Sequence, residues 1–198
     1  DVIRKIKECS SIEKIGHAGT LDPFAEGVLV VCTGNKTVES NNLMESKKNY
    51  HAHIHLGKTT DTLDTEGKII QTVSIPELSN PKINDVLNSF TGTIMQTPPY
   101  FCALKKNGVP LYKFARNDIF IRMRPRPVYI YDIKIISYKK PILKIDIVCG
   151  KGTYIRSLGS DIAKALGTVG YLVALSREKV GIYNKRNSFD LEEIVGDY

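Results

Sequence analysis

The sequence predicts an α/β (α+β-like) domain with a mixed, largely antiparallel central sheet and flanking helices. Residues 50–56 (YHAHIHL) alternate between apolar side chains and histidines, which is typical of a strand with one buried face. Apolar residues recur at helical spacing between Ile155 and Leu166, which indicates a helix with one buried side. Strand-like and helix-like segments are mixed along the chain, without a regular βαβ alternation and without internal repeats.

The other elements are expected from the same periodicities and from their flanking glycines and prolines. We expect helices over residues 2–9, 83–90 and 111–116, and a further helix that opens within residues 150–167 and has Gly167 as its C-cap. We expect strands over residues 28–32, 50–56, 68–73, 91–96, 128–137, 142–149, 171–175 and 179–182. Residues 122–127 (RMRPRP) are expected to be extended, because proline restricts the residue before it.

The composition limits the class of protein. The chain has 198 residues, of which 42% are hydrophobic and 25% charged, so neither general disorder nor a membrane protein is expected. No apolar run approaches the roughly 18 residues that span a bilayer, and the first residues do not show the pattern of a signal peptide. The scattered cysteines contain no CxxC pair, so we expect no structural zinc site and a cytoplasmic location; they are Cys9, Cys32, Cys102 and Cys149.

The net charge of +7 is concentrated in one segment. Residues 105–126 contain seven basic residues and one acid, Asp118, so this segment alone carries a charge of +6. Basic side chains interleaved with aromatic ones suit phosphate neutralisation and base stacking, which favours a nucleic acid over an ordinary solvated surface. The aromatic residues in or beside the segment are Tyr100, Phe101, Tyr112, Phe114 and Phe120.

Two other patterns have competing interpretations. The histidines of residues 50–56 could present a metal-binding face, but a half-exposed strand is favoured because no carboxylate or cysteine ligands occur at matching spacing. The GKGT segment (150–153) lacks the upstream glycine of a nucleotide-triphosphate loop, although a glycine-rich helix entry still favours an anion. Arg156 falls in the first turn of that helix, where a cation opposes the helix dipole, so it is either solvated or paired with a carboxylate.

Asp22 stands directly before Pro23, in a glycine-rich segment (16–27) that leads into the apolar run 28–32. Composition alone favours a turn here, with the glycines at positions of positive φ. A rigidly held catalytic acid is the alternative.

Five segments, taken in order, resemble the TruB family of tRNA pseudouridine synthases. The first contains the family's Gly-His-x-Gly-x-Leu-Asp-Pro core, and the resemblance extends to about Tyr183. It implies a pseudouridine synthase fold, with a catalytic domain over 1–183, a basic RNA-clamping insertion over 97–127 and the start of a C-terminal extension over 184–198. Family members usually begin with a Lys-Pro-Gly strand and commonly carry a C-terminal RNA-binding lobe, so we expect a catalytic domain trimmed at both ends. The segments are GHAGTLDPFAEGVLVVCTG (16–34), YHAHIHLGKTTDTLDTEG (50–67), TPPYFCALKKNGVPLYKFAR (97–116), GKGTYIRSLGSDIAKALG (150–167) and LVALSREKVGIY (172–183).

The resemblance implies isomerisation of uridine 55 in the T-loop of tRNA to pseudouridine, without a cofactor or metal. Asp22 matches the family's essential aspartate, its nucleophile; attack on the sugar C1′, attack on the base and formation of a glycal all stay open. Arg156 matches the arginine that pairs with this aspartate. Tyr50 matches the tyrosine that stacks on the flipped base and assists the late proton transfer at C5.

Further positions match binding residues of the family. Asp64 matches an acid that supports the arginine, and His17 matches a histidine near the extruded nucleotide, although it could simply cap a turn. The other matches are Tyr154 and Leu175 in the pocket wall, and Lys105, Lys106 and Arg116 in the segment that clamps the T-arm. The expected partner is tRNA, bound by a monomer. The alternatives are a guide-RNA-dependent pseudouridine synthase of a ribonucleoprotein and a non-catalytic tRNA-binding or tRNA-folding protein.

Overall fold

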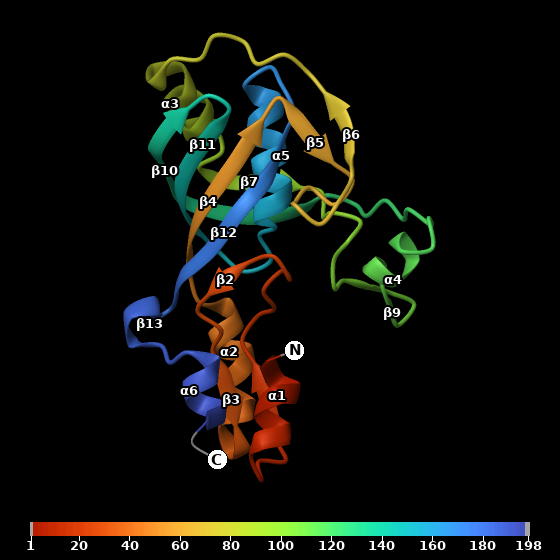
Figure 1. Cartoon of the computed structure of the whole chain (residues 1–198), viewed down its shortest axis with the longest axis vertical. Coiled ribbons are helices and arrows are strands. Elements are labelled where there is room, and N and C mark those ends of the chain that lie inside the picture. The colour runs from red at the N-terminus through yellow and green to blue at the C-terminus, as the bar shows by residue number, and fades with distance from the viewer. Residues whose placement is uncertain (1, 197–198) are drawn as a thin grey trace.

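The computed structural model describes residues 2–196. Its centre is a seven-stranded sheet (Figure 1). Six strands lie in the order β13 (Tyr183–Asn184), β12 (Gly170–Val180), β4 (Lys48–Leu56), β11 (Ile142–Cys149), β10 (Arg126–Lys139) and β7 (Gly92–Gln96). All five pairings along this path are antiparallel, whereas the short β2 (Glu26–Gly27) pairs with β12 in parallel. The expected mixed, largely antiparallel sheet is therefore confirmed.

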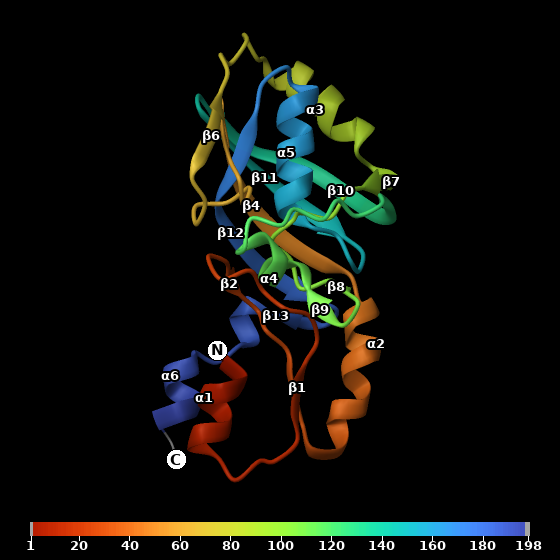
Figure 2. The same cartoon turned by 90° about the vertical axis from the view of Figure 1, so that its right-hand side faces the viewer.

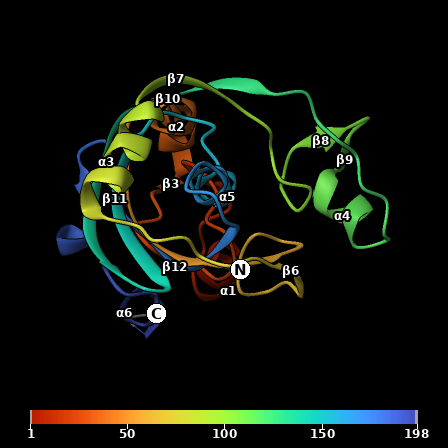
Figure 3. The ribbon, with the colours of Figure 1, turned by 90° about the horizontal axis from the view of Figure 1, so that it is seen from above.

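Helices α3 (Asn80–Ser89) and α5 (Ile155–Ala165) cover one face of the sheet, which curves around α5 (Figure 3). The predicted inward positions of β4 are buried, as are the apolar residues of α5, and together they form the main core. Gly167 follows α5 with a φ of +85°, as expected for a helix C-cap. The histidines of β4 lie on the opposite, partly exposed face.

A smaller lobe lies at one end of the sheet (Figures 1 and 2). Helix α1 (Val2–Cys9) packs beside α6 (Leu191–Gly196), although the two belong to opposite ends of the described chain. The same lobe contains the hairpin of β1 (Ile15–His17) and β3 (Val31–Thr33), a 3-10 helix (Gly34–Glu39) and α2 (Ser40–Glu45). A second 3-10 helix (Lys185–Asn187) leads from β13 towards α6.

Two hairpins extend from the body. Strands β5 (Lys58–Thr60) and β6 (Ile69–Thr72) form one. The other consists of β8 (Lys105–Lys106) and β9 (Val109–Pro110), followed by α4 (Leu111–Ala115). Figure 3 shows this second hairpin and α4 standing well away from the sheet.

The structure corrects three expectations about the elements. Residues 28–30 are not a strand, because only 31–33 pair with β1. The strands expected at 171–175 and 179–182 form the single strand β12, which ends at Val180. Helix α3 begins at Asn80, three residues earlier than expected, and Ser79 caps it by accepting a hydrogen bond from the Lys82 N–H. None of the helices within residues 2–196 is long and apolar enough to cross a membrane.

Candidate active site

Asp22 and Arg156 form a two-point ion pair at the N-terminus of α5. Arg156 Nε donates to Asp22 Oδ2 at 2.9 Å, and Arg156 Nη2 donates to Asp22 Oδ1 at 2.7 Å. The side chain of Arg156 is only 4% exposed, whereas that of Asp22 is 29% exposed. The cation that opposes the helix dipole is thus buried and paired with a carboxylate, and that carboxylate remains open to solvent on one side.

Two other segments contact the same guanidinium. Nη1 donates to the Thr62 carbonyl at 2.9 Å and lies 3.3 Å from Asp64 Oδ2, while Nη2 donates to the Phe101 carbonyl at 2.8 Å. With the two contacts to Asp22 this makes five, which matches the five N–H donors of a guanidinium. Arg156 therefore joins the Asp22 loop, the loop after β5 and the start of the basic insertion.

Asp64 is held in the orientation that this network requires. Its Oδ1 accepts hydrogen bonds from the Thr62 hydroxyl at 2.5 Å and from the Glu66 N–H at 3.0 Å. Its side chain is 4% exposed, so its charge depends on Arg156 and these donors for compensation. The structure thus brings Asp64 and Asp22 to the same arginine.

Tyr50 lies on β4 and is buried on the core side, as its place in the alternating pattern predicted. Burial raises the pKa of the Tyr50 phenol; the Arg177 guanidinium opposes this rise and the Asp22 carboxylate adds to it. The phenol is therefore protonated at neutral pH, and it lies within electrostatic range of Asp22.

Tyr154 and Leu175, which were predicted to lie in the pocket wall, belong to two different elements. Tyr154 is the N-cap position of α5; its N–H donates to Gln96 Oε1 at 2.8 Å and its carbonyl accepts from Gln96 Nε2 at 3.1 Å. Burial raises the pKa of the Tyr154 phenol. Leu175 is buried in the core opposite Ala52 of β4.

The hydrogen-bond network of Asp22 and Arg156 does not include His17. This residue lies in β1 opposite Val31. Its Nδ1 atom is buried and has no hydrogen-bond partner within residues 2–196.

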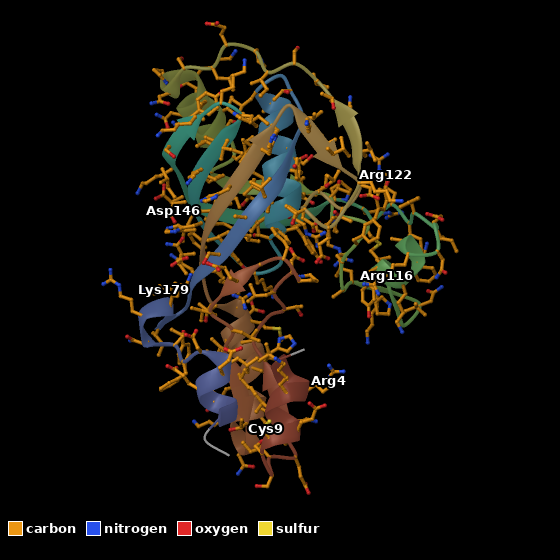
Figure 4. All side chains as sticks on the ribbon, viewed as in Figure 1. Arg4, Cys9, Arg116, Arg122, Asp146 and Lys179 are labelled. Carbon is orange, nitrogen blue, oxygen red and sulfur yellow. The ribbon has the colours of Figure 1, made fainter. Side chains whose placement is uncertain are left out.

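The basic residues of the insertion form a separate exposed group. Lys105 and Lys106 lie in β8, and Arg116 is the C-cap of α4, with its guanidinium 5.4 Å from the centre of the Tyr112 ring. Arg116 and Arg122 lie on the part that stands away from the sheet (Figure 4). In the described chain none of the seven basic residues of 105–126 forms a salt bridge, so their charge is available to a partner.

On the opposite face of the sheet, His51 lies beside carboxylates that its sequence spacing did not indicate. Its Nε2 is 3.1 Å from Asp146 Oδ1 and its Nδ1 is 3.8 Å from Glu178 Oε1. Figure 4 shows Asp146 on this part of the sheet. The residues that the structure describes contain no group of three or more His, Cys, Asp or Glu side chains arranged to hold a metal ion.

Sequence reasoning assigned no role to Arg177, a cation in β12 that is 1% exposed. Its side chain donates to the carbonyls of Gly19, Thr20 and Val28, which bracket Asp22 along the chain. Its position two residues after the buried Leu175 was the available sign, because a strand places such residues on one face.

Comparisons with known proteins agree with this geometry. The model of the family "TruB family pseudouridylate synthase (N terminal domain)" matches residues 7–155. The tRNA pseudouridine synthase B of Hydrogenovibrio crunogenus is 42% identical over 193 residues, which are 98% of this chain and 64% of that protein. The enzyme of the same name from Francisella philomiragia is 45% identical over 194 residues, with the same two shares. The chain thus spans less than two thirds of the length of these relatives.

Solved structures support the same assignment. A Cbf5-Nop10-Gar1 complex contains a chain that superposes with a TM-score of 0.70 at 28% identity, over 93% of this chain and 45% of that one. An archaeal box H/ACA sRNP Nop10-Cbf5 complex gives a TM-score of 0.70 at 26% identity, over 98% and 48%. The chain belongs to the TruB family of pseudouridylate synthases.

Proposed function

We propose that the protein isomerises uridine 55 in the T-loop of tRNA to pseudouridine. The observation that carries this proposal is the two-point pair between the partly open Asp22 carboxylate and the buried Arg156 guanidinium. In this reaction the bond between N1 of the base and C1′ of the ribose breaks, a bond between C5 and C1′ forms, and a proton moves from C5 to N1. Atoms and electrons balance within the nucleoside, so side chains alone can supply the chemistry.

The geometry suits this division of roles. Arg156 holds both carboxylate oxygens of Asp22 in place, which fixes the direction from which the exposed side of the carboxylate meets the nucleoside. Tyr50 offers a ring for stacking and a neutral phenol near the reacting base. Buried surroundings exclude water that would compete for a reactive sugar intermediate.

The basic insertion supplies binding energy for extruding the nucleotide. Flipping a base out of a folded loop costs a few kcal/mol, which stacking and phosphate contacts must offset. The insertion presents three exposed cations that form no salt bridge within the described residues, Lys105, Lys106 and Arg116. Contacts to a phosphate backbone require such cations. We assign residues 97–127 to the clamping of the T-arm, and place the enzyme in the cytoplasm as a monomer.

The test is to incubate the purified protein with unmodified tRNA, without any other RNA, and to map pseudouridine by sequence position. The proposal predicts one modified position, the T-loop uridine 55. Modification elsewhere in the tRNA would refute the assignment of position 55. Tight binding of tRNA without any product would favour a non-catalytic tRNA-binding or tRNA-folding protein.

A guide-RNA-dependent enzyme is the second candidate, because the structural neighbours include Cbf5 from box H/ACA complexes. Those chains are 26–28% identical, whereas the relatives named tRNA pseudouridine synthase B are 42–45% identical. The same assay separates the two functions. Activity that appears only after a guide RNA and partner proteins are added would support the second.

A further inference from the structure

Arg177 is one of the largest fully buried side chains, and it approaches the Asp22 loop from the strand beneath it. Its Nε donates to the Val28 carbonyl at 2.7 Å and its Nη2 donates to the Gly19 carbonyl at 3.0 Å. A longer contact of 3.5 Å joins Nη1 to the Thr20 carbonyl. The guanidinium thus binds carbonyls on both sides of Asp22, at the start and at the end of the loop.

The charge of Arg177 is compensated by carbonyl dipoles. No carboxylate within residues 2–196 lies within salt-bridge distance of it. A buried cation is costly unless acceptors surround it. A loop that moved away would remove those acceptors. The buried charge therefore favours the position that the loop has in this structure.

The backbone of Arg177 binds the same loop. Its carbonyl accepts a hydrogen bond from the Val28 N–H at 2.8 Å, where β2 runs parallel to β12. Gly27 has a φ of +100°, and a Cβ atom there would lie 2.3 Å from the Arg177 carbonyl oxygen. Only glycine allows the loop to approach the strand this closely.

Arg177 also lies opposite Tyr50 in the sheet. It is the register partner of Tyr50 across the β12–β4 pair, and the charge of its guanidinium opposes the rise that burial causes in the pKa of the Tyr50 phenol. The same residue therefore binds the loop that carries Asp22 through its side chain and lies opposite the tyrosine assigned to base stacking.

We propose that Arg177 is a positioning residue: its buried guanidinium holds the Asp22 loop, and its place opposite Tyr50 in the sheet fixes that loop relative to the tyrosine. This inference rests on the proposed function for its effect on rate. Misplacing reacting groups by about 1 Å can cost on the order of 100-fold in rate. Substrate affinity depends instead on the basic insertion, which Arg177 does not touch.

The variants for the test are Arg177→Met, Arg177→Lys and the control Lys179→Met. Lys179 lies two residues further along β12 but is exposed, so its replacement removes the same charge from the same strand without touching the loop. Figure 4 shows Lys179 on the lower part of β12, where that strand leads into β13. Single-turnover rates at saturating enzyme and dissociation constants for tRNA are measured for each.

We expect Arg177→Met to lower the single-turnover rate by about 100-fold while the tRNA dissociation constant changes by less than about threefold. Arg177→Lys keeps the positive charge but loses the planar set of N–H donors of the guanidinium. Its single-turnover rate should therefore be about tenfold higher than that of Arg177→Met. Lys179→Met should match the wild type. A single-turnover rate of Arg177→Met within about twofold of the wild type would overturn the proposal, as would an equal loss of rate and affinity. If Arg177→Met does not fold, Arg177→Lys decides by the same criteria.

Hydrogen exchange of the backbone amides gives a second measurement that needs no activity. Either Arg177 variant should speed exchange in residues 18–28 while the core strands β4 and β11 stay protected. An inactive wild type would refute the proposed function and leave this readout to decide the role of Arg177. Unchanged exchange in 18–28 would refute the positioning role even in an active enzyme.

Discussion

At the scale of single residues, Arg156 serves two carboxylates with different surroundings. Asp64 is almost fully buried and fixed by Thr62 and Glu66, whereas Asp22 keeps 29% of its side chain exposed. The buried acid anchors the arginine, and the arginine in turn orients the exposed acid. The geometry thus separates a structural carboxylate from one that can meet a substrate.

The loss of Arg156 is expected to lower the stability of the fold, mainly because it leaves the buried Asp64 carboxylate without its cation. We expect Arg156→Met to lower the free energy of unfolding by about 3–5 kcal/mol, since it leaves a buried carboxylate without its partner. The double variant Arg156→Met/Asp64→Asn removes that charge and should recover a large part of the loss. Urea denaturation monitored by circular dichroism measures both. A double variant less stable than Arg156→Met would contradict this account.

At the level of secondary-structure elements, the basic insertion and the sheet lie apart and carry different groups. Strand β8 carries Lys105 and Lys106 away from the body, while Asp22 and Tyr50 are held by the sheet and its loops (Figure 3). Binding and chemistry should therefore respond to different substitutions.

Replacing Lys105 and Lys106 by glutamine should weaken tRNA binding and make it less dependent on salt. Each lost phosphate contact lowers the slope of log affinity against log salt by about 0.7–0.9. The rate at saturating enzyme should stay within about twofold of the wild type. Fluorescence anisotropy across a salt series measures the slope. Lys82→Gln/Lys139→Gln, which removes one exposed charge from α3 and one from the end of β10, is the control and should leave the slope unchanged.

Elements with an uninterrupted period could be predicted from the sequence. Strand β4 alternates without a break, so its existence and its buried face were both predicted. Strand β12 has register shifts between Leu172 and Ala174 and between Arg177 and Lys179, which interrupt the alternation, and two strands were predicted where one exists. Residues 28–30 are apolar but satisfy their backbone through Arg177 and Ala18 rather than through a strand ladder.

The residues of the candidate site could also be predicted only in part from the sequence. Asp22, Arg156 and Tyr50 were identified by resemblance to a family, because no periodicity relates residues 134 positions apart. Arg177 was missed because its hydrogen bonds go to backbone carbonyls, so its position two residues after the buried Leu175 was the one sign of its burial. Two-residue strands such as β2, β8 and β13 depend on their pairing partners, and composition does not indicate them.

At the scale of the whole molecule, the site exists only where distant parts of the chain meet. Arg156 binds groups that lie 134, 94 and 55 positions away in the sequence. Every segment of this site must be in place before the guanidinium has its acceptors. The ion pair therefore depends on the complete fold of the main body.

The core also predicts how stability changes at alkaline pH. Burial raises the pKa of the Cys149 thiol to about 11, compared with about 8.5 in an unfolded chain. The folded state then binds a proton that the unfolded state has lost, so this stabilisation is complete below about pH 8.5 and disappears as the pH rises through 11. Burial of Tyr50 and Tyr154 acts in the same direction.

We therefore expect the free energy of unfolding to fall by roughly 3 kcal/mol between pH 8 and pH 11 through Cys149 alone. Urea denaturation at a series of pH values measures the decline. Cys149→Ala should flatten it, although the alanine variant starts from a lower stability. An equally steep decline in the variant would show that Cys149 does not cause it.

The release of tritium from tRNA labelled at C5 of uridine tests the role of Asp22 in the isomerisation, because that hydrogen leaves only when C5 bonds to the ribose. We expect the wild-type protein to release tritium from the T-loop uridine. With Asp22→Asn, release should be slower by at least about 1,000-fold, with the tRNA dissociation constant within about threefold of the wild type. Release by Asp22→Asn at a rate near that of the wild type would contradict the role of Asp22 and, with it, the mechanism proposed for this site.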